Sequence, residues 1–275
     1  MYIGIVCPNF SGSTVVGSVL HRFSSVQHVG EIWKVFSEKH KDVAFCKECG
    51  GDHCPHFSAS FKAYLKGLPQ DDISSALKER FQSEFIVSGD KRPYYYKNFS
   101  GMPDKILVLL KNKYSAALSY AKRVEGFSHK GGSVQSADIF REAAESYYKD
   151  LASRVKWVES NFANENIIYA SPEVIVDMGD SDLARFGKSL FGKEIMISST
   201  PFDENFHYIG GNHKISKGKD RSYFKGEFRP DRRYEVIMSP SEKEIVNRVV
   251  EKNFRDLDLT ITDTDFIESW VKDLL

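Results

Sequence analysis

The sequence predicts an α/β fold in which a central parallel sheet lies between two layers of helices. Two observations carry this prediction. Short apolar segments with the length of buried strands alternate along the chain with segments of helical periodicity. The clearest apolar segments are YIGIV (2–6) and KILVLLK (105–111), and a helical pattern follows each of them closely.

The remaining elements follow in chain order. The helix at 71–85 is expected because Ile73, Leu77, Phe81 and Phe85 recur every four residues. The last helix begins at Pro240, since SPSE (239–242) is a capping box with proline at the first helical position. The expected strands are 2–6, 26–30, 84–90, 105–111 and 166–171, and the expected helices are 14–23, 31–40, 71–85, 113–123, 137–162 and 240–254.

Length and composition limit the class of protein. The 275 residues are expected to form a single domain, 1–275, with a Cys/His-containing insert at about 41–57. The formal net charge is zero, which argues against nucleic acid and anionic membrane surfaces as partners. The apolar runs are shorter than the roughly 18 residues of a membrane span, and no leader pattern is evident, so a cytoplasmic location is expected.

The loop after the first strand reads PNFSGSTVV (8–16) and has the composition of an anion site. Backbone N–H groups at a helix N-terminus, close approach at Gly12, and the hydroxyls of Ser11, Ser13 and Thr14 suit a phosphate or sulfate oxygen. Residues 1–20 contain neither Lys nor Arg, so the Gly-Lys-Ser/Thr signature of nucleotide-hydrolysing loops is absent. A plain strand–helix turn capped by Ser and Thr is the alternative.

Three segments together resemble the sulfotransferase family, whose members use 3′-phosphoadenosine-5′-phosphosulfate (PAPS). They are SGSTVV (11–16), VGE (29–31) and VLLKNKYSAALSY (108–120). The resemblance implies a P-loop-NTPase-like sulfotransferase fold. It also implies transfer of a sulfuryl group to a hydroxyl of a carbohydrate, lipid or small molecule, so the expected partners are the nucleotide co-substrate and this acceptor.

The resemblance assigns roles to several cations. Lys111 and Ser119 occupy the positions that hold the 3′-phosphate of the cofactor, with Lys111 in place of the family's Arg. Lys91, in VSGDKRP, takes the place of a Lys near the transferred group. FHYIGGN (206–212) resembles the His-x-x-Gly-Gly-Asn segment of bacterial members. Lys217 and Gly218 match an element that covers the 3′-phosphate. They lie in a stretch, 214–233, with eight Lys or Arg and three acids.

The same resemblance suggests the catalytic groups. Glu31 occupies a position that serves as general base in some relatives, and His28 is an alternative base. Ser13 and its neighbours would stabilise charge on the leaving phosphate. A helix N-terminal acid and a structural histidine are the plain interpretations of Glu31 and His28. Phe10 stands where relatives carry a basic residue, which leaves open which cation contacts the sulfuryl group.

The segment CKECGGDHCPHF (46–57) has the residue types of a zinc site. Cys46, Cys49, Cys54 and His56 are the expected ligands of a possible structural zinc. Reduced thiols without metal are the alternative, and an insert common to similar bacterial sulfotransferases is another explanation of the segment.

Two other functions are compatible with the sequence. One is a P-loop-like nucleotide-binding protein or kinase, against which the missing Gly-Lys-Ser/Thr argues. The other is a sulfotransferase relative that binds nucleotide or glycan without catalysis, because Phe10 removes a cation that relatives use.

Overall fold

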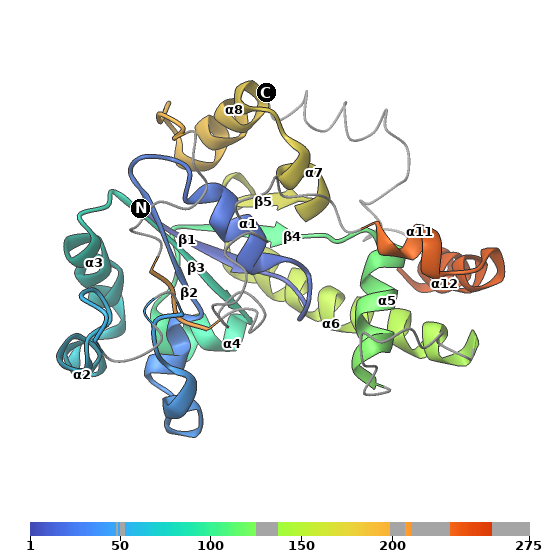
Figure 1. Cartoon of the computed structure of the whole chain (residues 1–275), viewed down its shortest axis with the longest axis horizontal. Coiled ribbons are helices and arrows are strands. Elements are labelled where there is room, and N and C mark those ends of the chain that lie inside the picture. The colour runs from blue at the N-terminus through green and yellow to red at the C-terminus, as the bar shows by residue number, and fades with distance from the viewer. Residues whose placement is uncertain (48, 50–52, 125–136, 199–206, 211–231, 255–275) are drawn as a thin grey trace.

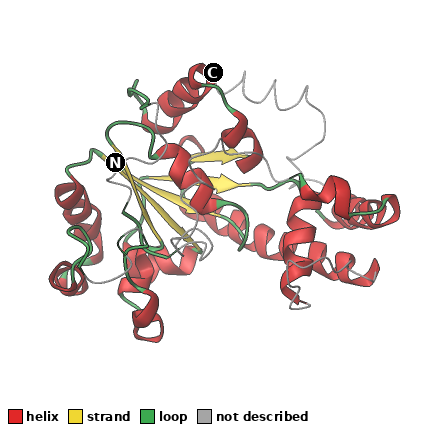
Figure 2. Ribbon diagram, in the orientation of Figure 1, coloured by secondary structure: helices red, strands yellow, loops and turns green. Residues whose placement is uncertain are grey.

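The computed structural model describes residues 1–47, 49, 53–124, 137–198, 207–210 and 232–254. Its centre is a five-stranded sheet with the order β2-β3-β1-β4-β5, in which all neighbouring strands are parallel. Figure 2 shows these strands as a fan with helices on both sides. The strands are β1 (Tyr2–Val6), β2 (Val26–Gly30), β3 (Phe85–Lys91), β4 (Lys105–Leu109) and β5 (Ile167–Ala170).

Helices and helical turns connect these strands and cover the sheet (Figure 1). The main α-helices are α1 (Ser13–Leu20), α2 (Ala59–Gly67), α3 (Gln70–Phe81), α5 (Lys113–Val124), α6 (Ala137–Asn161), α8 (Asp180–Phe191) and α12 (Pro240–Asn253). The shorter ones are α4 (Pro93–Tyr95), α7 (Pro172–Asp177) and α11 (Arg233–Ile237), with a π-helical turn at Tyr96–Ser100 and 3-10 turns at Ile32–Val35, Glu38–Val43 and Asn164–Asn166.

Each face of the sheet buries its own apolar cluster, as the period-two geometry of strands requires. Ile3 and Ile5 of β1 pack with Val16 and Leu20 of α1 and with apolar residues of α7 and α8. Tyr2 and Val6 belong to the opposite cluster, which α3, α5, α6 and α12 complete. The predicted α/β architecture with a central parallel sheet between helical layers is therefore confirmed.

Two predicted helices differ from the structure. The segment 31–40 forms 3-10 turns, and the four consecutive residues Ile32, Trp33, Lys34 and Val35 are buried, a pattern different from the single buried stripe expected of an amphipathic helix. The helix predicted at 71–85 ends at Phe81, where Gln82 takes a left-handed conformation, and Phe85 begins β3. The capping box predicted at the start of α12 is present in full.

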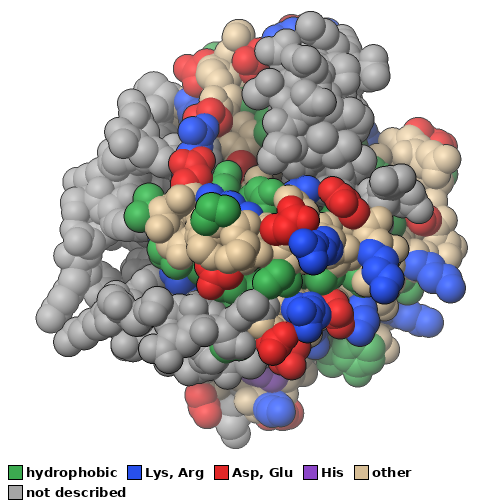
Figure 3. All heavy atoms as spheres, turned by 90° about the vertical axis from the view of Figure 1, so that its right-hand side faces the viewer, with side chains coloured by type: hydrophobic (Ala, Val, Ile, Leu, Met, Phe, Trp, Pro, Cys, Tyr) green, Lys and Arg blue, Asp and Glu red, His purple; other side chains and the backbone are tan. Residues whose placement is uncertain are grey.

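The surface reflects the balanced composition. Acidic and basic side chains are interspersed on the face that includes α11 and α12 (Figure 3). Among the described residues, no helix combines the length and the apolar character that crossing a membrane requires.

Candidate active site

The loop between β1 and α1 has the backbone of an anion cradle. Gly12 is the residue that precedes α1 and has a φ of 83°, in the left-handed region that favours glycine. A Cβ there would lie 3.3 Å from the ring of Pro172. Ser11, Ser13 and Thr14 are buried at this turn, and the first turn of α1 carries no acidic residue. The loop therefore presents N–H groups and hydroxyls at the start of a helix whose first turn carries no acidic residue.

A cation from another strand stands beside this loop. The Lys111 Nζ donates to the backbone oxygen of Phe10 at 3.2 Å and to Ser119 Oγ at 2.9 Å. Lys111 follows β4 and is buried, and Ser119 lies on α5. The structure thus brings together Lys111, Ser119 and the loop, which the sequence separates by about a hundred residues. The positive charge that the loop lacks comes from the carboxyl end of β4, where open α/β sheets bind ligands.

Phe10 itself points away from the interior. Its side chain is 52% exposed, its φ is 65°, and its ring meets the Tyr120 ring edge-on at a centroid distance of 6.3 Å. The residue at this position therefore supplies its carbonyl to Lys111 instead of a charge to the site.

Arg154 of α6 joins the ends of two central strands, and sequence reasoning missed it. Its guanidinium donates to the backbone oxygens of Cys7 and Lys91, and it makes a two-pronged ion pair with Asp150 at 2.7 and 2.8 Å. Arg154 is buried, so these carbonyls gain partners that water cannot supply. Arg154 lies on the buried stripe of α6 with Tyr147, Leu151 and Val158, so a charged residue on an otherwise apolar stripe was the signal that could have found it.

Glu31 lies directly after β2 and is held between two lysines. One carboxylate oxygen pairs with Lys34 at 2.6 Å and the other with Lys91. Burial alone would raise the pKa of Glu31, but the two ammonium groups outweigh burial and lower it to about 2. The structure therefore brings together Glu31 and Lys91, and the carboxylate stays ionised at neutral pH.

A cleft of about 250 Å³ opens at this point, beside the loop and the ends of β2 and β3. Its most buried acid is Asp90, which accepts the backbone N–H of Trp33 at 3.2 Å. Burial raises the pKa of Asp90 to about 7. The cleft therefore contains two carboxyl groups with pKa values that differ widely, a pattern typical of acid–base sites. It is lined by Asn9, Glu31, Trp33, Lys34, His40, Asp90, Lys91, Arg92 and Tyr95.

His28, the alternative base, lies away from this cleft. It is 1% exposed, its Nδ1 contacts the backbone oxygen of Val87 at 3.2 Å, and a Cβ on Gly17 would fall 2.4 Å from its ring. Burial lowers the pKa of His28 to about 3, so it remains neutral. This environment is that of a packed structural histidine in the sheet.

The segment 207–210 packs against Glu31. Ile209 accepts the Glu31 N–H at 2.6 Å and donates to Val29 at 3.0 Å, so it pairs with the end of β2. Gly210 has a φ of 74°, and a Cβ there would lie 2.9 Å from both the Glu31 Cβ and the Lys34 Nζ. The resemblance noted for FHYIGGN (206–212) thus falls, in its described part, on a segment that touches the predicted base.

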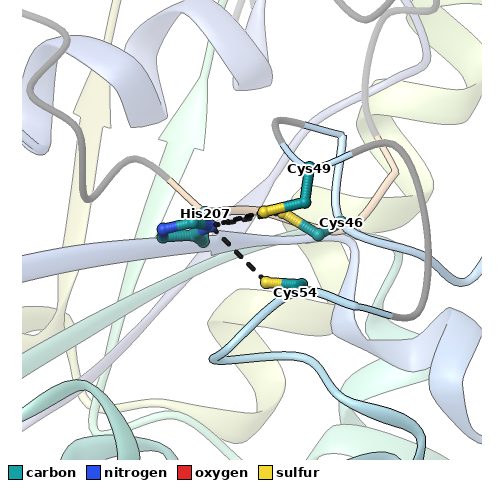
Figure 4. A group of neighbouring side chains, drawn as sticks. All are labelled: Cys46, Cys49, Cys54 and His207. Atoms are coloured by element: carbon teal, nitrogen blue, oxygen red, sulfur yellow. Dashed lines mark hydrogen bonds between the residues drawn. The ribbon is translucent and has the colours of Figure 1, made fainter.

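The three clustered cysteines meet a histidine other than the expected one. Cys46, Cys49 and Cys54 direct their sulfur atoms at the ring of His207 (Figure 4). His56 lies outside this group, with its ring centroid 4.5 Å from that of His207. The set Cys46, Cys49, Cys54 and His207 can hold a metal ion, so the structure replaces His56 by a residue that is remote in sequence.

Lys217 and Gly218 lie outside the described residues, as does most of the basic stretch 214–233. The residues that sequence reasoning missed are Asp90, Arg154 and His207. Asp90 directly precedes Lys91 in VSGDKRP, and His207 belongs to FHYIGGN, so attention to neighbours of the recognised segments would have found both.

The parallel sheet between helical layers, with a cleft at the carboxyl ends of its strands, has a fold similar to that of solved sulfotransferase domains. The sequence matches no protein-family model and no curated protein. The structure aligns with the sulfotransferase domain of the curacin biosynthetic pathway at a TM-score of 0.53 and 14% identity, over 92% of this chain and 96% of that domain. The sulfotransferase domain of the Synechococcus PCC 7002 olefin synthase aligns at a TM-score of 0.51 and 12% identity, over 90% and 93%. The resemblance predicted from sequence therefore holds at the level of the fold.

Proposed function

We propose that this chain is a PAPS-dependent sulfotransferase that sulfates a hydroxyl of a carbohydrate, lipid or small molecule. The observation that carries this proposal is the contact of Lys111 with Ser119 and with the Phe10 carbonyl, which sets a buried cation against the anion loop. The sulfotransferase-type fold supports the same assignment.

The donor binds along the edge of the sheet where these groups meet. The loop N–H groups with Ser11, Ser13 and Thr14 hold the 5′-phosphate, and Lys111 with Ser119 holds the 3′-phosphate. Lys217 and Gly218 are proposed to cover the 3′-phosphate. Because Ser119 already bonds to Lys111 at 2.9 Å, both groups are held in place before the anion arrives.

Transfer is an in-line displacement at sulfur. The bond between sulfur and the bridging phosphate oxygen breaks, a bond between sulfur and the acceptor oxygen forms, and adenosine 3′,5′-bisphosphate leaves. The Ser13 hydroxyl and the loop N–H groups stabilise the charge that develops on the leaving phosphate. Lys91 faces the sulfonate and supplies the cation that Phe10 does not.

Glu31 accepts the acceptor proton. In the ligand-free site its pKa of about 2 reflects the pairs with Lys91 and Lys34. A sulfonate competes with Glu31 for the Lys91 ammonium, and a carboxylate that loses one of two cationic partners becomes a stronger base. Glu31 is therefore activated when the donor is present.

The nucleotide assignment is tested by calorimetric titration with adenosine 3′,5′-bisphosphate in the absence of Mg²⁺. Lys111→Ala should weaken binding at least tenfold, or about 1.4 kcal/mol. Lys105→Ala is the matched control, because Lys105 lies at the opposite end of β4, where it donates to Ser189. Equal affinity in wild type and Lys111→Ala would refute the placement of the 3′-phosphate.

The base is tested by comparing Glu31→Gln with Asp90→Asn. With Glu31 as base, Glu31→Gln lowers kcat by about 10²–10⁴ while bisphosphate binding stays near that of wild type. The pH profile of kcat/KM, which reports the free enzyme, then stays flat on its acid side down to the lowest pH at which the protein is folded. A fall centred near pH 7 that disappears in Asp90→Asn would assign the base to Asp90.

The two other functions give different results. Thermal stabilisation by Mg-ATP but not by adenosine bisphosphate would favour a nucleotide-binding protein or kinase. Binding of the bisphosphate without loss of labelled sulfate from PAPS, across a panel of hydroxyl acceptors, would favour a non-catalytic relative.

A further inference from the structure

Hydrogen bonds between thiols and imidazole cannot explain the geometry of the cysteine cluster. The Sγ atoms of Cys46, Cys49 and Cys54 lie 3.5, 3.4 and 3.5 Å from the same atom, His207 Nδ1. An imidazole nitrogen either carries one proton or offers one lone pair, so it can form one good hydrogen bond. Three sulfur atoms around one nitrogen are the arrangement of ligands around a shared centre.

We propose that Cys46, Cys49, Cys54 and His207 bind one structural Zn²⁺. Zinc–sulfur bonds of about 2.3 Å and a zinc–nitrogen bond of about 2.0–2.1 Å, at tetrahedral angles, separate sulfur from nitrogen by about 3.5–3.6 Å. The three observed separations match this value. The four ligand atoms all lie within 4.8 Å of one another. Two sulfur ligands of a tetrahedral zinc lie about 3.8 Å apart, so metal binding shortens the sulfur–sulfur distances by about 1 Å at most.

The surroundings also suit a closed, structural site. Cys46, Cys54 and His207 are buried, and the backbone N–H of Phe57 points to Cys54 Sγ at 3.3 Å, as expected of a group that supports a metal-bound thiolate. The Cys46-x₂-Cys49 spacing is common in structural zinc sites. Four protein ligands leave no open position for a substrate, so this zinc does no chemistry on one.

The zinc joins two segments that are 161 residues apart in sequence. Lys47 donates its backbone N–H to Tyr208 at 2.9 Å, and Gln27 of β2 donates to the His207 carbonyl at 3.0 Å. The same segment continues to Ile209, which accepts the Glu31 N–H. The metal therefore fixes the segment that packs against Glu31 without contacting Glu31 itself.

Metal analysis of the full-length protein, purified without chelators or a polyhistidine tag, tests the proposal. We expect about one zinc per chain. A thiol-specific mercurial should modify the three cysteines and release the zinc in parallel, and a metallochromic dye detects the released metal. This assay uses the wild-type protein, so it does not depend on the folding of a variant. Replacement by Co²⁺ should give the intense visible bands of a tetrahedral thiolate site.

Variants then identify the fourth ligand. His207→Ala should lose zinc, whereas His56→Ala, the matched control in the adjacent ring, should retain it. If His207→Ala fails to fold, the cobalt spectrum of His56→Ala decides, since an unchanged spectrum excludes His56 as the ligand. Four results would each overturn the proposal. They are less than about 0.2 equivalents of zinc with no uptake on addition of Zn²⁺, iron in place of zinc, a disulfide among the three cysteines, and loss of zinc only in His56→Ala.

Discussion

Asp90 should make the stability of the protein fall as the pH rises through neutrality. The perturbation is Asp90→Asn, which keeps the size of the side chain and removes its titration. Burial raises the pKa of Asp90 from an ordinary value of 3.8 to about 7. The folded state therefore binds a proton more tightly than the unfolded state, and stability is lost as the pH rises between these two values.

The expected magnitude follows from the two pKa values. At pH 5.5 the folded state keeps Asp90 protonated, and at pH 8 it must hold a buried carboxylate. Integrating the proton linkage over this interval gives a loss of about 2 kcal/mol in the free energy of unfolding. His28 acts in the opposite direction below pH 6.5, because its pKa is lowered to about 3. The informative quantity is therefore the difference between wild type and variant.

Urea unfolding at a series of pH values between 5.5 and 8 provides the measurement. The free energy of unfolding of Asp90→Asn minus that of wild type should increase by about 2 kcal/mol from pH 5.5 to pH 8. A control, Asp104→Asn, changes an acid that accepts the Tyr2 N–H at the other end of the sheet. Curves for wild type and Asp90→Asn that remain parallel over the whole range would refute the reasoning.

Three further predictions follow from named contacts. Arg154→Met should destabilise the fold by about 1–3 kcal/mol in urea unfolding, because the buried Cys7 carbonyl loses its guanidinium donor and Asp150 loses its ion pair. A loss well under about 1 kcal/mol would contradict this. Gly210→Ala should lower the free energy of unfolding by about 1–2 kcal/mol, because residue 210 has a left-handed backbone conformation. It should also lower turnover, because the added Cβ would displace Glu31. Unchanged turnover would argue against the contact between Gly210 and Glu31. Burial raises the pKa of Cys7 to about 11, so Cys7 should resist alkylation at pH 8 until the protein unfolds, as peptide mass mapping can check.

The sequence predicted those parts of the structure that local patterns determine. Apolar runs located all five strands, and the SPSE capping box placed the start of α12 at Pro240. The resemblance to the sulfotransferase family assigned Lys111 and Ser119 to one phosphate position, and the structure brings the two side chains into contact.

The remainder depends on contacts between distant segments. The histidine in the cysteine cluster comes from residue 207, so no local spacing could distinguish it from His56. The low pKa of Glu31 requires Lys91, which is 60 residues away and reaches it only because β2 and β3 are neighbours. Residues 31–40 form 3-10 turns in place of the predicted α-helix, and burial is concentrated in residues 31–35 instead of following one helical stripe.

The pairing of Ile209 with β2 has a consequence for aggregation. β2 is a terminal strand of the sheet, and such strands expose backbone groups to which another chain can add. Ile209 occupies part of this border by bonding to Val29 and Glu31, and Gln27 is engaged by the neighbouring His207. If the segment 207–210 detaches, the backbone edge of β2 becomes accessible to other molecules. Protection against self-association and the integrity of the Glu31 site therefore depend on the same four residues.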